Sequence, residues 1–209
     1  MRRANVQLQS DWRAEILAAA ERCFTRAGFH QTSMHEICVE AGMSPGNLYR
    51  YFPSKEAIIA GICESDRAEA AENFAAVDRA PDFFQGLEAL ARHHLVERSA
   101  DEVGLCAEIM AESRRNPAVA RQYQEIEREV KALLTDMMQR AADRGEISRD
   151  VDFAGAADVL MALSDGMSWR RAVDPAFNAS GVMPLILDMV RCLLTRHATE
   201  PHMQKEHSL

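Results

Sequence analysis

Apolar side chains recur every three or four residues along almost the whole chain, which is the spacing of helices that bury one face. No segment shows a convincing strand pattern, so the sequence predicts an all-α protein. The first helix begins at a cap residue, Ser10 or Asp11, and Gly28 supplies the left-handed residue at its end. About nine helices are expected, at residues 10–28, 33–41, 44–52, 55–79, 83–95, 103–116, 119–145, 152–173 and 182–196.

The second and third predicted helices are short and have clear boundary signals. Ser33 and Glu36 have the spacing of a capping box, in which each side chain bonds the other residue's backbone N–H. Gly42 ends the second helix, and Ser44 followed by Pro45 begins the third, since proline is well tolerated in a first helical turn. Two short helices joined by a tight turn indicate a helix-turn-helix.

Other residue types in this segment fit the same motif. Cys38 is small enough to lie where the two helices cross, and Leu48 and Phe52, four residues apart, would hold the third helix from below. The faces that remain would be open to solvent. They carry Ser44, Pro45, Gly46, Asn47, Tyr49, Arg50 and Tyr51.

These side chains suit contact with DNA. Small residues at the start of a helix let its backbone approach closely, Asn47 can bond a base edge, and Arg50 can pair with guanine or phosphate. Tyrosine hydroxyls commonly contact phosphates, and Lys55 at the start of the next helix can reach the DNA backbone. Spacing alone leaves open an ordinary helix-loop-helix corner with exposed tyrosines.

Residues 32–37 (Thr-Ser-Met-His-Glu-Ile) and 41–55 (Ala-Gly-Met-Ser-Pro-Gly-Asn-Leu-Tyr-Arg-Tyr-Phe-Pro-Ser-Lys) resemble the TetR/AcrR family of bacterial transcriptional regulators. The resemblance is strong over about residues 10–65 and weak beyond. It implies a DNA-binding domain at about 10–70, with the helix-turn-helix at 33–52, and a ligand-binding and dimerisation domain at 71–198. The tail, 199–209, is expected to be disordered.

The resemblance also implies a homodimeric repressor that leaves a palindromic operator in double-stranded DNA when a small molecule binds. By position, Thr32 or Ser33 matches the hydroxyl that caps the second helix and contacts phosphate. The residues at 45–47 match the base-facing start of the recognition helix, Tyr49 and Tyr51 match phosphate-contacting aromatics, and Lys55 matches a phosphate-binding lysine. Arg50 stands at a variable position, so its base contact is our own expectation.

Charge is distributed unevenly along the 209 residues. The chain has 24 basic and 32 acidic side chains, a net charge of −8, which argues against a protein that coats nucleic acid with its whole surface. Residues 1–56 carry 7 basic and 6 acidic side chains, whereas the other 153 residues carry 17 basic and 26 acidic side chains. A small DNA-binding module on an acidic domain with another task fits this contrast.

The compartment is expected to be the reducing cytoplasm. The five cysteines lie far apart without a C-x-x-C pair, which indicates small buried residues rather than disulfides or zinc ligands. Residues 1–12 have no apolar segment of a secretory signal, and no apolar run approaches the length of a membrane span. No membrane partner is therefore expected.

The carboxy-terminal part is expected to form the dimer and to bind the effector. A four-helix interface across a two-fold axis would use the apolar stripes of the last two helices, although these stripes could instead bury within one subunit. Its candidate residues are Leu160, Leu163, Met167, Ile186, Met189 and Leu193. A largely apolar effector would contact adaptable methionines and nearby aromatic and polar groups, although such residues are more often core. The candidates are His94, Cys106, Met110, Tyr123, Met138, Met167 and Trp169.

Other residues of the sequence bear on the charge of the effector and on the class of protein. Glu108 or Glu112, if buried, would favour a cationic effector, but both fit a solvated face equally. An enzyme is disfavoured: none of the seven histidines follows a glutamate by three residues, and no common nucleophile, nucleotide or zinc motif occurs, so no cofactor or metal is expected. A helical adaptor that binds only protein would leave the tyrosines of the third helix and Lys55 without a role.

Overall fold

The computed structural model describes residues 2–196, with side chains from residue 11 onward, and this part of the chain is helical without strands. The predicted all-α fold is confirmed, and the expected disordered tail at 199–209 lies outside the described residues. The elements are α1 (Arg2–Gln31), α2 (Met34–Glu40), α3 (Pro45–Tyr51), α4 (Lys55–Asp78), α5 (Phe83–Arg92), the π-helical turn η1 (His93–Glu97), α6 (Ala100–Ser113), α7 (Pro117–Asp143), α8 (Phe153–Val173) and α9 (Ala179–Thr195).

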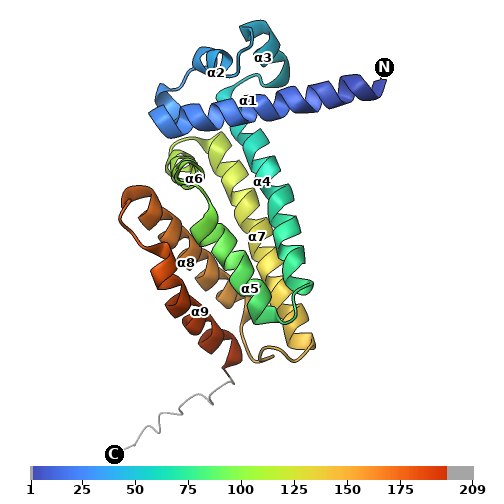
Figure 1. Ribbon diagram of the computed structural model, residues 1–209, viewed down its shortest axis with the longest axis vertical. Coiled ribbons are helices and arrows are strands. Elements are labelled where there is room, and N and C mark those ends of the chain that lie inside the picture. Colours follow the sequence, from blue (N-terminus) through green and yellow to red (C-terminus); the bar gives the residue numbers. More distant parts are fainter. Residues whose placement is uncertain (1, 197–209) are drawn as a thin grey trace, which may run out of the picture.

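The helices form a small head and a longer body (Figure 1). The head consists of α1, α2, α3 and the start of α4, and α1 lies across the end of the bundle that forms the body. Helix α4 belongs to both parts, since it begins beside α3 and then runs along α7. The body contains the rest of α4 and the elements α5 to α9.

Each part has its own core. In the head, Ile16, Phe24, Ile37, Leu48 and Phe52 are almost fully buried against Ile58, Ile59 and Ile62 of α4. Leu105, Ile109 and Val119 from α6 and α7 join this cluster, so the head packs firmly on the body. The body core is formed around Phe83, Met137, Met138, Met183 and Leu194.

Capping explains most helix boundaries. Side chains of Asp82, Ser99, Asn116, Asp152 and Asn178 accept backbone hydrogen bonds at the starts of α5 to α9. At the end of α7, Gly145 has φ 76° and its N–H bonds Ala142 O, while Glu146 N bonds Ala141 O. This is a Schellman motif, which confirms the predicted stop at Gly145.

Several boundaries differ from the prediction; α6 and α9, for example, each begin three residues earlier than expected, at Ala100 and Ala179. Helix α1 begins at Arg2, because residues 2–9 contain no helix breaker and the helix continues through Ser10 and Asp11 instead of starting there. Gly28 has a positive φ of 77°, but its ψ of 161° is extended, and a helical turn follows it. The helix expected at 83–95 ends at Arg92 and passes into η1.

Within residues 2–196, no helix is both long and apolar enough to cross a membrane.

Candidate DNA-binding site

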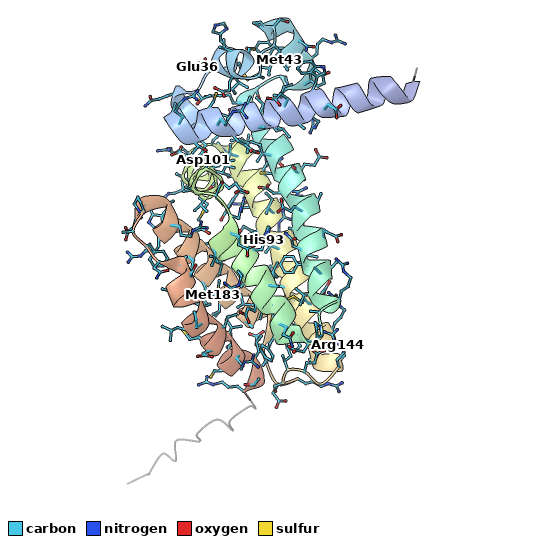
Figure 2. The ribbon with its side chains drawn as sticks, viewed as in Figure 1. Glu36, Met43, His93, Asp101, Arg144 and Met183 are labelled. Atoms are coloured by element: carbon cyan, nitrogen blue, oxygen red, sulfur yellow. The ribbon has the colours of Figure 1, made fainter. Side chains whose placement is uncertain are left out.

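Helices α2 and α3 form the predicted helix-turn-helix. Ser33 caps α2 in a complete capping box, with its hydroxyl oxygen accepting from Glu36 N at 3.1 Å and Glu36 Oε2 accepting from Ser33 N at 2.6 Å. The hydrogen bonds of the Ser33 backbone and hydroxyl lower the pKa of the Glu36 carboxyl. Figure 2 labels Glu36 on α2 and Met43 in the turn that follows.

The turn between the two helices is a second Schellman motif. Gly42 has φ 63°, its N–H bonds Val39 O at 3.1 Å, and Met43 N bonds Cys38 O at 3.0 Å. Cys38 is 1% exposed and lies in the same core cluster as Leu48 of α3. The predicted turn at Gly42 is therefore confirmed, and the small Cys38 is buried in the core that the two helices share.

Helix α3 lies with one face in the core and the other in solvent. Leu48 and Phe52 are buried, as the spacing predicts, while Ser44, Pro45, Gly46 and Arg50 are exposed. Tyr49 is 52% exposed, an unusually open position for a large aromatic residue. Asn47 and Tyr51 are partly buried. The Ser44 hydroxyl makes no capping bond, so the side chain at this start of α3 does not serve the helix itself.

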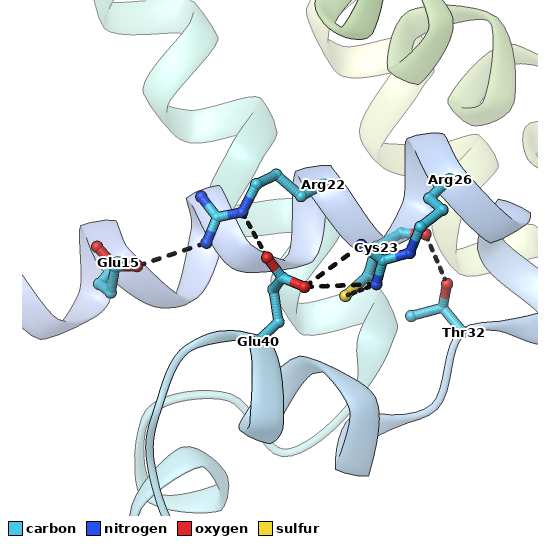
Figure 3. A network of polar contacts seen from close by, with 6 residues as sticks. All are labelled: Glu15, Arg22, Cys23, Arg26, Thr32 and Glu40. Carbon is cyan, nitrogen blue, oxygen red and sulfur yellow. Dashed lines mark hydrogen bonds and ion pairs between the residues drawn. The ribbon is translucent and has the colours of Figure 1, made fainter.

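A polar network attaches α2 to α1 (Figure 3). Glu40 of α2 accepts from Arg22 Nε at 2.8 Å and from Arg26 Nη1 at 3.3 Å, and Arg22 also pairs with Glu15 at 3.6 Å. Hydrogen bonds from Arg22 lower the pKa of Glu40. Arg13 pairs with Glu64 of α4 at 2.8 Å. The arginines of α1 at 13, 22 and 26 are thus occupied by carboxylates, and Arg50 of α3 makes no ion pair among the described residues.

The structure separates the two hydroxyls that sequence reasoning offered as alternatives. Ser33 is exposed and caps α2, whereas Thr32 is 2% exposed and donates its hydroxyl to Cys23 O and Gly28 O. Lys55 also turns inward: its ammonium donates to Thr32 O at 2.7 Å and to Phe29 O, and lies over the Phe29 ring. Burial lowers the pKa of Lys55. In this arrangement Thr32 and Lys55 hold the head together.

Comparisons with known proteins agree with this geometry. Residues 16–62 match the family described as "Bacterial regulatory proteins, tetR family", and residues 85–195 match "BetI-type transcriptional repressor, C-terminal". The chain is 34% identical to the HTH-type transcriptional regulator UidR of Escherichia coli K12 over 156 residues, 74% of this chain and 79% of UidR. The chain belongs to the TetR family.

Solved structures of TetR-family proteins have the same fold. Salmonella enterica GusR is 35% identical, with a TM-score of 0.76 over 88% of this chain and 95% of GusR. Bacillus subtilis FadR in complex with stearoyl-CoA has a TM-score of 0.76 over 85% of this chain and 97% of FadR, but at 17% identity it shows the fold alone. Members of the family are transcriptional regulators rather than enzymes, and this chain is therefore a DNA-binding regulator of transcription.

In the body of this TetR-family chain, several polar side chains gather where α4, η1, α6, α7 and α8 meet. We call this group the polar recess; its members are Asp66, His94, Cys106, Tyr123, Glu127 and Asp165. Burial lowers the pKa of His94 to about 4 and raises the pKa of Cys106, Tyr123, Glu127 and Asp165. Tyr123 and Glu127 lie one turn apart on α7, and the neighbouring carboxylates add to the effect of burial in raising the pKa of Tyr123.

Two members of the polar recess reach the surface of the protein. The side chains of Asp66 and His94 are exposed, yet the surrounding protein removes enough water to raise the pKa of Asp66 and to lower that of His94. Sequence reasoning did not single out Asp66, Glu127 or Asp165, because acidic residues on long helices usually lie on a solvated face.

The structure brings only some of the predicted effector residues together. His94, Cys106 and Tyr123 belong to the polar recess. Met138 and Met167 are buried in the body core, Met110 on α6 belongs to neither core, and Trp169 is 52% exposed on the outside of α8. Among the described residues no cluster of three or more potential metal ligands occurs.

The predicted dimer residues also divide into two sets. Met167 and Ile186 are buried in their own subunit, with Leu160, Leu163 and Leu193 packed partly against the same core, and Met189 is 60% exposed. The other large exposed apolar residues of the body lie nearby on α8 and α9. They are Val159, Trp169, Val173 and Leu185, which together with Met189 we call the α8–α9 apolar face. On α8 and α9, one face packs into the core of the subunit, and the neighbouring face is exposed to solvent.

Proposed function

We propose that this chain is a homodimeric repressor that binds a palindromic operator through α3 and releases it when a small molecule occupies the polar recess. The observation that carries the proposal is the outer face of α3, where Ser44, Tyr49 and Arg50 lie open to solvent without serving the head's own structure. Hydroxyl, phenol and guanidinium groups are the usual donors to DNA phosphates and base edges.

Two heads are needed for tight binding. Among the described side chains, the head of one subunit offers few free cations, because Arg13, Arg22 and Arg26 are paired with glutamates. A dimer doubles the phosphate contacts and places two copies of α3 in successive major grooves, about 34–36 Å apart. The α8–α9 apolar face supports this dimer, since five large apolar side chains are exposed on two helices that pack against each other.

The polar recess supports control by a ligand. One of its members, Asp66, lies on α4, the helix that continues into the head, so a ligand that shifts α4 would change the distance between the two copies of α3. FadR of Bacillus subtilis was solved with stearoyl-CoA, which shows that this fold can hold a ligand with both polar and apolar parts. The polar side chains of the recess favour an effector that carries hydrogen-bonding groups beside any apolar part.

Selection of bound sequences from a random DNA pool tests the proposal, followed by titration of the enriched sequence at two salt concentrations. The expected result is a palindrome with two half-sites and a steep salt dependence. Tyr49→Phe, which removes one hydroxyl and keeps the ring, should weaken binding to all sequences, whereas Asn47→Ala should relax sequence preference. If ligand-stripped, refolded protein enriches no sequence, the repressor proposal is refuted.

A further inference from the structure

The joint between head and body contains a buried carboxylate. Among the described side chains, the nearly buried polar residues are Thr32 and Glu112, each 2% exposed. Thr32 is satisfied by two carbonyl acceptors, but Glu112 Oε2, near the end of α6, has no well-aligned hydrogen bond. A buried carboxylate oxygen without a hydrogen bond destabilises the folded protein. The charged groups near Glu112 therefore influence how stable the contact between head and body is.

The nearest of those neighbours is a histidine of the head. His30 Nε2 lies 2.8 Å from Glu112 Oε2, while the rest of the His30 side chain is 64% exposed and in contact with solvent. The backbone around His30 is fixed within the head, because Lys55 donates to Phe29 O and Thr32 O on either side of it. A change in the contact between His30 and Glu112 therefore acts on a part of the backbone that is firmly attached to the rest of the head.

The other cations near Glu112 are more distant from it than His30 or are bonded elsewhere. Arg115 Nη2 lies 3.8 Å from the same oxygen and its side chain is 63% exposed, and Lys55 of α4 directs its ammonium to backbone carbonyls. Two further carboxylates lie at the joint: Glu108 of α6 next to Gly28 of α1, and Glu56 of α4, bonded by Asn116 at 3.2 Å. With neutral His30, the closest ion pair of Glu112 is the one with the exposed Arg115 at 3.8 Å.

We propose that His30 and Glu112 form a proton-sensitive joint, through which protonation of His30 stabilises the effector-free arrangement of head and body and strengthens operator binding. Histidine is the side chain that normally changes charge between pH 5 and 8. A protonated imidazole places a positive charge 2.8 Å from Glu112 Oε2, closer than the Arg115 guanidinium at 3.8 Å. A state that gains from a bound proton is favoured as the pH falls, so operator affinity rises from pH 8 to pH 6. The inference rests on the proposed function, which takes the effector-free state as the one that binds the operator.

The test is operator affinity at pH 6, 7 and 8 and constant ionic strength, measured with the selected DNA sequence by fluorescence anisotropy. The unaltered protein should lose affinity about three- to tenfold between pH 6 and pH 8. His30→Gln should flatten this profile. His35→Gln is the matched control, because His35 is an exposed histidine of α2 in the same head, and this variant should keep the part of the profile that His30→Gln loses.

Glu112→Gln keeps the shape of the side chain and removes its charge. It should flatten the profile to the same extent as His30→Gln, and the double variant should add nothing further, since both changes remove one interaction. His30→Gln decides the result if Glu112→Gln does not fold, because the exposed imidazole is not part of a core.

Two failures are distinguishable. A His30→Gln profile parallel to that of the unaltered protein overturns the joint while leaving operator binding intact, and a profile flattened only by His35→Gln assigns the pH effect to direct DNA contact. If no operator is bound at any pH, the proposed function itself fails and the inference falls with it.

Discussion

Two cations that lie five residues apart in the head have different environments. Lys55 donates to two backbone carbonyls and lies 4.3 Å from the centre of the Phe29 ring, so its charge stabilises the chain between α1 and α2. Arg50 is exposed on α3 and has no ion-pair partner in the described part of the chain. Residue type alone does not distinguish these environments, since both side chains are long, basic and close to the DNA-binding face.

The two cations should respond differently to removal of charge. Lys55→Met should lower the free energy of unfolding by about 2 kcal/mol, because two hydrogen bonds from a charged donor are lost. Arg50→Gln should leave stability unchanged within about 0.5 kcal/mol, and should weaken operator binding while lowering the salt slope. Urea unfolding and DNA titration at two salt concentrations measure both quantities. A Lys55→Met protein of unaltered stability but weakened DNA binding would assign Lys55 to phosphate contact instead.

Among the elements, α3 is a short helix that is held in place by the structure around it. It has seven residues, so its stability comes from the burial of Leu48 and Phe52 and from the turn at Gly42, rather than from its own helix propensity. Gly46 in its first turn has no heavy atom within 4 Å of the place where a Cβ would lie. Gly46 is exposed, so this open space faces solvent.

Substitution of the two glycines of this motif by alanine should therefore distinguish effects on stability from effects on operator binding. Gly46→Ala should stabilise the head by about 0.5–1 kcal/mol, since alanine favours a helix, yet weaken operator binding because the added methyl keeps the backbone from the DNA. Gly42→Ala should destabilise the head by about 1 kcal/mol or more, because φ 63° strains an alanine even in open space. Urea unfolding and operator titration check both variants. Normal operator affinity in Gly46→Ala would show that this backbone does not approach DNA.

The sequence predicts local features of these elements better than long-range ones. Ser33 with Glu36, Gly42 and Gly145 act within one or two helical turns, so their roles follow from spacing. The inward turn of Lys55 depends on the carbonyls of Phe29 and Thr32, more than twenty residues away, and the contact of His30 with Glu112 depends on how α6 packs on α1. Only tertiary packing determines such contacts.

On the scale of the whole molecule, charge and apolar surface are separated. The acidic body repels phosphates, so the DNA is approached by the outer face of the head. Large exposed apolar residues of the body gather on α8 and α9, which lie on the side of the body opposite α4 (Figure 1). This arrangement suits two bodies that pack through the α8–α9 apolar face while both heads remain free to reach one DNA duplex.

Charge introduced into the α8–α9 apolar face should separate the subunits. Leu185 and Met189 lie one turn apart on α9 and are 65% and 60% exposed, so a double change to glutamate leaves the core of each subunit intact. The Leu185→Glu, Met189→Glu protein should sediment as a monomer and lose operator affinity about a hundredfold or more, because a single head lacks the avidity of two. Val39→Glu is the matched control: Val39 is 68% exposed on α2, and its change should leave the sedimenting mass unaltered. A dimer that persists in the double variant would place the interface on another surface, whereas a monomer with normal operator affinity would show that one head suffices.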